Sequence, residues 1–392
     1  MSEKRKTTIF TVCYLAYTLI YVARLNLSVS STCFIEAQIL DSAGIGLLGG
    51  VFSVIYAFSR LINGYISDNI SPRRMIGVGL LIVGISNICM GLLPGIAGLV
   101  VLWGLNAFGQ SMLWGPILRI VANTYDEQTA KKITSYMVTS VTTGNIAGII
   151  LNTVIINKIG FKFAFVIPGI MAIIFCGIVR LTLKKVVHSS PDQYEKKHIP
   201  ITSLFKVPIV RRVLIPAIFH GMIKDNISVW MTIFFVDKYN INLSQSAGFV
   251  LFIPIIGFIG RITYPFCHKL AKMNEHTVSV FAFALCVISA AVLCIGTVPP
   301  AVAAICLSLL YAGASIANTS ILSIFPLQFA ESDNVASVSG IMDFATYFGA
   351  GVSSFIYGNA INALGYTPMF LSWAIISVIS IIVLRPLITK GP

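Results

Sequence analysis

The sequence is poor in charge, and in negative charge above all. Only 10% of its 392 residues are charged, and its 14 Asp and Glu residues are outnumbered by 27 Lys and Arg residues. With 56% hydrophobic residues and a mean hydropathy of +0.88, the chain has too much apolar surface for a protein that folds in water. The composition therefore predicts an integral membrane protein.

Catalytic and metal-binding motifs are also missing from the sequence. It has no glycine-rich phosphate loop outside the apolar segments and no nucleophile motif, so an enzyme is the class it fits least. The eight cysteines are scattered without a CxxC pair or a His/Cys cluster, which predicts reduced thiols, no disulfide, no metal and no cofactor. The polar start MSEKRKTT precedes the first apolar run without a cleavage signature, so we expect no removable signal peptide.

Apolar runs long enough to cross a bilayer, at about 20 residues per crossing, predict an all-α protein with twelve transmembrane helices. The predicted spans lie near 8–31, 44–67, 74–94, 98–122, 133–157, 161–183, 212–236, 246–268, 277–297, 299–323, 335–360 and 366–387. A polar interval divides them into a six-helix half over 1–183, a cytoplasmic linker over 184–211 and a second half over 212–392. Two six-helix halves are typical of secondary transporters, which hold substrate near the membrane midplane.

Basic residues fall mainly on one side of the predicted membrane. That side contains the N-terminal segment, the linker and three short basic loops, whereas Lys158, Lys162 and Lys238 fall on the other. The positive-inside rule therefore places both termini in the cytoplasm. The same bias explains most of the net charge of +13, which indicates topology and contact with anionic lipids rather than nucleic acid.

Ionisable residues inside the predicted spans are mostly basic. They are Arg24, Arg60, Arg119, Lys224, Asp225, Arg261 and Asp343. A charge at the bilayer centre costs about 2.5 kcal/mol or more, so this excess of bases predicts a mobile anionic ligand. Three roles for Asp343 remain open: it neutralises Lys224, binds a proton or forms a structural pair. Asp225 is turned about 100° from Lys224 on a helix, which predicts that it serves packing or another partner.

Aromatic side chains accompany these bases. Tyr17, Tyr21 and Arg24 share one helical face by their spacing, and Tyr14 lies near it. A face with two phenols and an arginine is not expected to meet lipid. The aromatic residues predicted to line a pocket are Tyr14, Tyr17, Tyr21, Trp114, Trp230 and Tyr347.

The loop NGYISDNISPRR contains a Gly-x-x-x-Asp element, Gly64 to Asp68, followed by Arg73 and Arg74. It resembles the signature loop of the major facilitator superfamily. The resemblance implies that the glycine permits tight helix contact and that the aspartate joins a cytoplasmic charge network that controls access. Arg119, late in the fourth predicted span, is expected to join that network.

Two further stretches resemble the organophosphate:phosphate antiporter family of that superfamily. They are Tyr21-x-x-Arg24-x-Asn26 and the run from Tyr56 through Ser67-Asp68-x-x-x-Pro72-Arg73. The resemblance implies that Arg24 grips the substrate phosphate and that Lys224, six residues before Trp230, is the second phosphate-binding residue. A planar guanidinium and a compact ammonium, one from each half, suit a bridging phosphate. Arg60 is expected to be a third basic contact, or else to pair near the cytoplasmic helix ends.

The sequence departs from these relatives in two places. Some bacterial members have a histidine in the fifth span, where this chain has only hydroxyls, and His268 occupies the place of the second loop aspartate. The resemblance implies exchange of a sugar phosphate, glycerol phosphate or phosphoglycerate for inorganic phosphate by a monomer in the plasma (bacterial inner) membrane. Two alternatives are proton-coupled symport of an organic carboxylate, with Asp343 as the proton site, and a sensor of phosphate esters without significant flux.

Overall fold

The computed structural model describes residues 2–92, 95–183, 200–241, 243–272 and 274–389, and within these ranges the regular structure is helical. Contacts divide the chain into two compact units. The first contains Met1–Ile199 and Leu327–Gly340, and the second contains Pro200–Pro326 and Ile341–Pro392. Most of the predicted linker lies outside the described residues, and the predicted boundaries at 183 and 212 stay a prediction.

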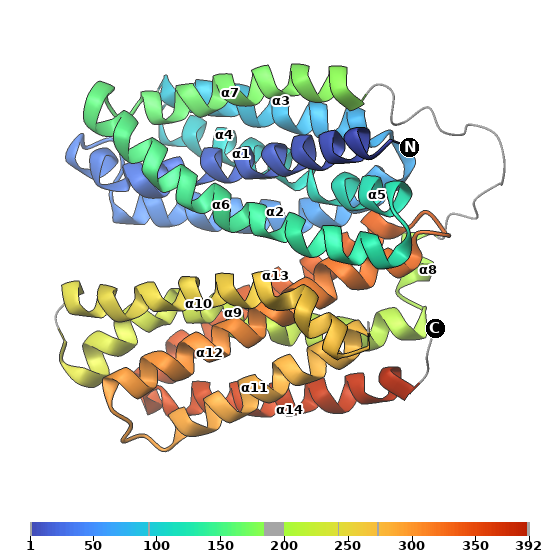
Figure 1. The fold of residues 1–392 in the computed structure, drawn as a ribbon. Helices are drawn as coiled ribbons and strands as arrows, with labels where there is room; N and C mark the ends of the chain where they lie inside the picture. Colours follow the sequence, from blue (N-terminus) through green and yellow to red (C-terminus); the bar gives the residue numbers. More distant parts are fainter. Residues whose placement is uncertain (1, 93–94, 184–199, 242, 273, 390–392) are drawn as a thin grey trace. The chain divides into compact units, whose positions relative to one another are not determined.

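The first unit is a bundle of long helices. Its helices are α1 (Glu3–Glu36), α2 (Ser42–Asn69), α3 (Pro72–Gly91), α4 (Ile96–Ser111), α5 (Trp114–Thr124), α6 (Glu127–Ile159) and α7 (Phe163–Thr182). Within it α1 packs along α6 and α3 along α7 (Figure 1). The fourth predicted span is split into α4 and α5, and Pro116 in the first turn of α5 has no N–H to continue the ladder of α4.

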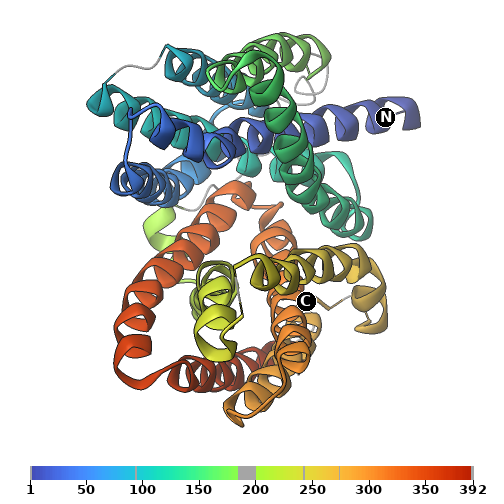
Figure 2. The same ribbon diagram turned by 90° about the vertical axis from the view of Figure 1, so that its left-hand side faces the viewer.

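The second unit is also helical. It contains α8 (Ile201–Leu204), α9 (Pro208–Tyr239), α10 (Leu243–Leu270), α11 (Glu275–Cys294), α12 (Pro300–Asn318), the π-helix η2 (Thr319–Ile324), the start of the 3₁₀-helix η3 (Phe325–Phe329), most of α13 (Val335–Leu364) and α14 (Thr367–Thr389). Three of these helices, α10, α12 and α14, pack against α9, which lies among them in Figure 2.

Ten segments of the described chain are helical, long and apolar enough to cross a membrane. The seventh and eighth predicted spans correspond to α9 and α10, which are long enough to cross a bilayer. The centre of α9 is polar, because His220, Lys224, Asp225 and Asn226 follow one another closely there. The twelve crossings and the cytoplasmic termini stay predictions.

Local sequence signals explain where the helices begin. Asp41, Asp126 and Asn274 cap α2, α6 and α11, each accepting a hydrogen bond from the backbone N–H three residues later. At Asp126 the bond from the Thr129 N–H holds the pKa of the carboxyl below its usual value. Proline occupies the first turn of α3, α9 and α12, where its missing N–H costs nothing.

Small residues set the helix spacing in the first unit. A Cβ on Gly84 of α3 would lie 2.8 Å from the carbonyl oxygen of Gly169 on α7, and a Cβ on Gly169 would lie 2.8 Å from that of Gly84. Such contact is too close for any side chain, so glycine at both positions lets the two backbones approach. Close approach through small residues is how helices associate in lipid, where dispersion forces replace the hydrophobic effect.

Candidate functional site

A stripe of polar and aromatic side chains runs along α1. Tyr14, Tyr21 and Arg24 are partly exposed, Ser28 is exposed and Tyr17 is buried. These residues recur at intervals of three and four, so they share a helix face. A charged guanidinium and a row of hydroxyl groups are costly to place against lipid, and the stripe is therefore better suited to an aqueous cavity.

Arg24 lies among three aromatic rings, which we call the aromatic cage. Its guanidinium carbon is 4.4 Å from the ring centroid of Phe52, 5.1 Å from that of Tyr56 and 5.7 Å from that of Tyr21. Phe52 and Tyr56 stack on each other with centroids 5.7 Å apart, and both are buried. Cation–π attraction helps to hold this guanidinium in place, and guanidinium groups in general bind anions through N–H groups in the plane of the fork.

The aromatic cage connects to the other predicted residues of the first unit. The ring of Tyr17 is 5.4 Å from that of Tyr21 and 4.7 Å from that of Trp114. On the other side, the guanidinium of Arg60 is 5.8 Å from the Tyr56 ring. Arg60 is 4% exposed and donates to the carbonyl oxygen of Ser111 at 3.5 Å. Tyr56 therefore lies against two arginines, and the structure gathers these residues into one region.

Buried amides fix α1 next to this region. Asn26, two residues after Arg24, donates from Nδ2 to Oδ1 of Asn87 on α3 at 2.6 Å. Asn87 donates in turn to Oδ1 of Asn106 on α4 at 3.2 Å, and Gln110 donates to the same oxygen at 3.1 Å. Because buried amides are costly to leave unpaired, this amide network favours one register of α1 against α3 and α4.

Lys224 of the second unit pairs with its neighbour. Its Nζ lies 2.8 Å from Oδ1 of Asp225, and both side chains are partly buried. The expectation that Asp225 points away from Lys224 was therefore wrong. Helical periodicity fixes the direction of the Cβ atoms, but the long stem of lysine lets its ammonium reach back to an adjacent carboxylate.

The remaining predicted residues of the second unit lie on α9 and α13. Trp230 donates from Nε1 to Oδ1 of Asn226 at 3.2 Å, and Asn226 donates to Oγ of Ser353 on α13 at 2.8 Å. Asp343 is 6% exposed and Tyr347 is partly exposed. Arg24 and Lys224 belong to different units.

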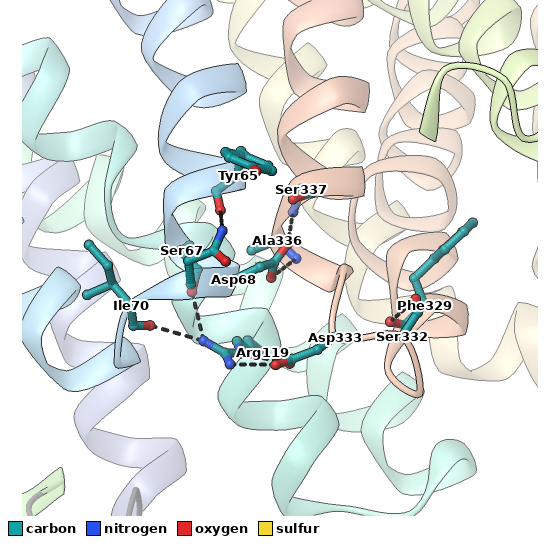
Figure 3. A network of polar contacts seen from close by, with 11 residues as sticks. Tyr65, Ser67, Asp68, Ile70, Arg119, Phe329, Ser332, Asp333, Ala336 and Ser337 are labelled. Carbon is teal, nitrogen blue, oxygen red and sulfur yellow. Dashed lines mark hydrogen bonds and ion pairs between the residues drawn. The ribbon is translucent and has the colours of Figure 1, made fainter. Parts of the chain in front are cut away.

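Asp68, at the end of α2, binds the start of α13. Its carboxylate accepts hydrogen bonds from the backbone N–H groups of Ala336 at 3.1 Å and Ser337 at 2.7 Å (Figure 3). These are among the N–H groups that the first turn of a helix cannot bond internally, and the helix dipole also favours a negative charge there. The carboxylate therefore caps α13.

Arg119 of α5 completes this charge network, which we define as Asp68, Arg119, Asp333 and the start of α13. Its guanidinium donates to both carboxylate oxygens of Asp333, at 3.0 and 2.7 Å (Figure 3). It also donates to the carbonyl oxygens of Ser67 and Ile70 at 2.8 and 3.0 Å, which close the end of α2. Arg73 and Arg74 begin α3 nearby, and neither forms an ion pair among the described residues.

Glycine lets α2 approach α13 at this point. A Cβ on Gly64 would lie 2.6 Å from the carbonyl oxygen of Ala336 and 3.0 Å from the Cα of Gly340. A Cβ on Gly340 would in turn meet the carbonyl oxygen of Arg60. The glycine of the Gly-x-x-x-Asp element thus allows the backbones of α2 and α13 to lie in contact, and the aspartate of the same element binds the first turn of α13.

The corresponding loop of the second unit has different chemistry. Nε2 of His268, at the end of α10, lies 3.9 Å from Oε2 of Glu275, at the start of α11, and both side chains are 4% exposed. Tyr264 stacks on His268 and shares a hydrogen bond of 2.9 Å with Ser320. In this loop the imidazole of His268 faces the carboxylate of Glu275, whereas in the first unit the carboxylate of Asp68 caps α13.

Phe52 and Asp333 were not predicted from the sequence. Phe52 had a usable signal, because Phe52, Tyr56 and Arg60 follow one another at four-residue intervals and so share a face of α2. Asp333 lies in the turn before α13 with a positive φ of 54°, and no sequence spacing connects it to Arg119.

If Arg24 binds phosphate, as the resemblance implies, replacing Phe52 with leucine should weaken that binding about 3- to 30-fold, the equivalent of one cation–π contact of about 0.5–2 kcal/mol. Phe52→Tyr keeps a ring and should bind as the wild type does. The measurement is the concentration of inorganic phosphate that half-saturates exchange in proteoliposomes. Phe163→Leu, which removes an exposed ring at the start of α7, is the matched control. Equal phosphate affinity in Phe52→Leu and Phe163→Leu would show that the Phe52 ring does not position Arg24 for phosphate.

A bundle of apolar helices in two units, with cations and aromatic rings held inside, defines a multi-span membrane transporter. From residue 13 to residue 354 the sequence matches the Major Facilitator Superfamily, and the chain belongs to this superfamily of transporters, which are not enzymes. The solved structure of the superfamily transporter FucP, in its outward conformation, covers 97% of this chain and 99% of its own with a TM-score of 0.77. At 17% identity, that likeness shows the shared fold.

Curated relatives are similar over shorter regions. The probable hexose phosphate transport protein of Chlamydia trachomatis serovar D is 32% identical over 166 residues, which are 42% of this chain and 36% of that protein. The membrane sensor protein UhpC of Escherichia coli (strain K12) is 28% identical over 165 residues, 41% of this chain and 37% of that protein. The chain thus spans little more than a third of the length of these relatives. Their bacterial origin points to the plasma (inner) membrane for this multi-pass protein.

Proposed function

We propose that the protein is a twelve-span secondary transporter, with both termini cytoplasmic, that exchanges a phosphorylated small organic molecule for inorganic phosphate. The observation that carries the proposal is Arg24, held by the aromatic cage on the polar stripe of α1. The neutral rings hold the guanidinium in place without cancelling its positive charge, and a guanidinium can donate two parallel hydrogen bonds to one phosphate. Similarity to a hexose phosphate transport protein supports phosphate esters as the anions.

The proposed mechanism uses two cations, Arg24 of the first unit and Lys224 of the second. Asp225 balances the charge of Lys224, so an incoming phosphate competes with this carboxylate for the ammonium. A ligand that binds one access state better than the other shifts the populations by that difference in affinity. We propose that phosphate provides this difference, that only the loaded carrier reorients readily, and that the protein works as a monomer.

The charge network has a separate proposed role, control of cytoplasmic access. Asp68 binds the start of α13 through backbone N–H groups and Arg119 binds the turn before it, so the network can form or break as a single unit. Such contacts at an element's end are typical of two-state gates.

Purified wild-type protein should exchange labelled phosphate in phosphate-loaded proteoliposomes, and an imposed pH gradient should leave the rate unchanged. The physical reason is that the anion itself supplies the negative charge that the site lacks. Acceleration by an inward proton gradient, with uptake of carboxylates, would support proton-coupled symport through the buried Asp343 instead. The similarity to UhpC favours a second candidate, a sensor, which would bind phosphate esters without counterflow.

A further inference from the structure

Three hydroxyl groups meet between α1 and α6 in the first unit. The phenol oxygen of Tyr14 lies 3.0 Å from Oγ1 of Thr139 and 2.8 Å from Oγ1 of Thr143. The two threonines are one turn apart on α6. Thr143 is exposed, whereas Tyr14 and Thr139 are partly buried. We call these three residues the hydroxyl cluster; Thr139 and Thr143 have no role in the function proposed above.

The contacts of Thr139 suggest a direction for the hydrogen bonds of the hydroxyl cluster. Its Oγ1 lies 2.7 Å from the carbonyl oxygen of Tyr136, which can only accept, and 3.0 Å from the phenol oxygen of Tyr14. We assign its proton to the shorter contact, so that Thr139 acts as an acceptor towards Tyr14. A hydroxyl has a single proton to donate, and that of Tyr14 therefore goes to Thr139. Thr143 must then donate to Tyr14. In this assignment the hydrogen bonds run from Thr143 to Tyr14, from Tyr14 to Thr139 and from Thr139 to the carbonyl oxygen of Tyr136, which can only accept.

This direction makes Thr143 an acceptor at the exposed end of the chain. Its only proton is engaged by Tyr14, and the lone pairs of Oγ1 are left for an outside group. Hydrogen bonds in such a chain polarise one another. The exposed end therefore favours a donor such as an alcohol, and disfavours a carboxylate or a phosphate oxygen, which are acceptors when ionised.

The hydroxyl cluster lies close to Arg24. Gly144, next to Thr143, packs so tightly on α1 that a Cβ there would lie 2.6 Å from both the carbonyl oxygen of Thr18 and the Cβ of Tyr21. Thr143 itself bonds Tyr14, which precedes Arg24 by ten residues, whereas Thr18 and Tyr21 precede Arg24 by six and three residues. These separations correspond to about 5–15 Å along the helix axis, a range that includes the span of one sugar ring.

We propose that Thr143 binds a hydroxyl group of the substrate's organic part, so that the substrates are uncharged polyol phosphates of about sugar size rather than phosphoglycerate. The proposal rests on the proposed function, because it takes Arg24 as the phosphate site. The two sites select by opposite chemistry. The arginine offers donors to the phosphate, and the hydroxyl cluster offers an acceptor to an alcohol.

The test measures how well three probes inhibit phosphate exchange in proteoliposomes. They are a hexose monophosphate, hexyl phosphate, which has the same carbon count but no hydroxyl, and phosphoglycerate. The wild type should prefer the hexose monophosphate. Thr143→Val should weaken its inhibition about 3- to 10-fold, the equivalent of one neutral hydrogen bond, and leave hexyl phosphate and phosphate itself unchanged. Thr143→Ser should behave as the wild type does.

Thr153→Val is the matched control, since it makes the same change at an exposed position of α6 ten residues further along. Two outcomes with phosphate exchange intact would overturn the hydroxyl site alone. Thr143→Val could weaken inhibition by the hexose monophosphate and by hexyl phosphate equally, or it could weaken neither. A wild type that prefers phosphoglycerate would also overturn it. If the wild type neither exchanges nor binds phosphate, as measured by thermal shift in detergent, the proposed function fails and the hydroxyl site with it.

Discussion

Replacing Arg24 with lysine should lower phosphate exchange on the order of 100-fold, although the positive charge remains. Lysine loses the planar fork that donates two parallel hydrogen bonds to one phosphate. It also stacks less well on Phe52 and Tyr56, which hold the guanidinium at 4.4 and 5.1 Å. The measurement is counterflow of radiolabelled phosphate in proteoliposomes of purified protein.

Two further variants help to interpret a loss of exchange in Arg24→Lys. Lys224→Ala removes the cation of the second unit and should reduce exchange to a similar degree. Arg211→Lys, at an exposed position near the start of α9, is the matched control and should exchange phosphate normally. Unchanged melting temperatures in detergent would show that the variants are folded. Full activity in Arg24→Lys would mean that the aromatic cage holds an arginine that does not bind the substrate.

Replacing Gly64 with alanine should lower exchange about ten-fold or more, because the new methyl group has no room between α2 and α13. Its Cβ would lie 2.6 Å from the carbonyl oxygen of Ala336, and overpacking of this kind costs about 1–3 kcal/mol. Moving α13 away would also break the hydrogen bonds from its first turn to Asp68. Exchange rates in proteoliposomes give the first measurement.

A labelling experiment separates loss of the contact from general unfolding. In a cysteine-free background, a cysteine replacing the buried Ser337 should react with a membrane-impermeant thiol reagent about ten-fold faster when Gly64 is alanine. Gly49→Ala is the matched control, because a Cβ at Gly49, also on α2, has nothing within 4 Å. Equal labelling in both variants would show that α13 does not depend on Gly64 for its place.

Hydropathy predicted most of the fold, because a membrane permits few alternatives to a helix for a long apolar run. It did not predict interruptions that depend on single residues, such as the break between α4 and α5 before Pro116 or the π-helix that follows α12. For the site, spacing placed Tyr17, Tyr21 and Arg24 on one face of α1. Spacing describes where a Cβ points, and it was wrong at Asp225 because the flexible stem of Lys224 reaches its neighbour.

Contacts between distant segments were the least predictable part. The partners of Arg119 and Asp68 lie more than 200 positions away, at Asp333 and at the start of α13. Periodicity within one helix contains no information about such pairs. The resemblance to a known loop assigned Asp68 to a charge network, but the groups it binds are N–H groups of the main chain, which no residue type at positions 336 and 337 would reveal.

This last feature affects how the charge network can change during evolution. Any residue except proline presents the same N–H, so the two backbone hydrogen bonds of Asp68 require no particular side chain at position 336 or 337. The constraint at this point of the charge network is on side-chain volume. Gly64 and Gly340 face backbone atoms and have no room for a Cβ, whereas a Cβ on Gly115 would lie 2.9 Å from the methyl carbon of Ala336. A change of Gly115 to alanine should therefore be found together with a change of Ala336 to glycine.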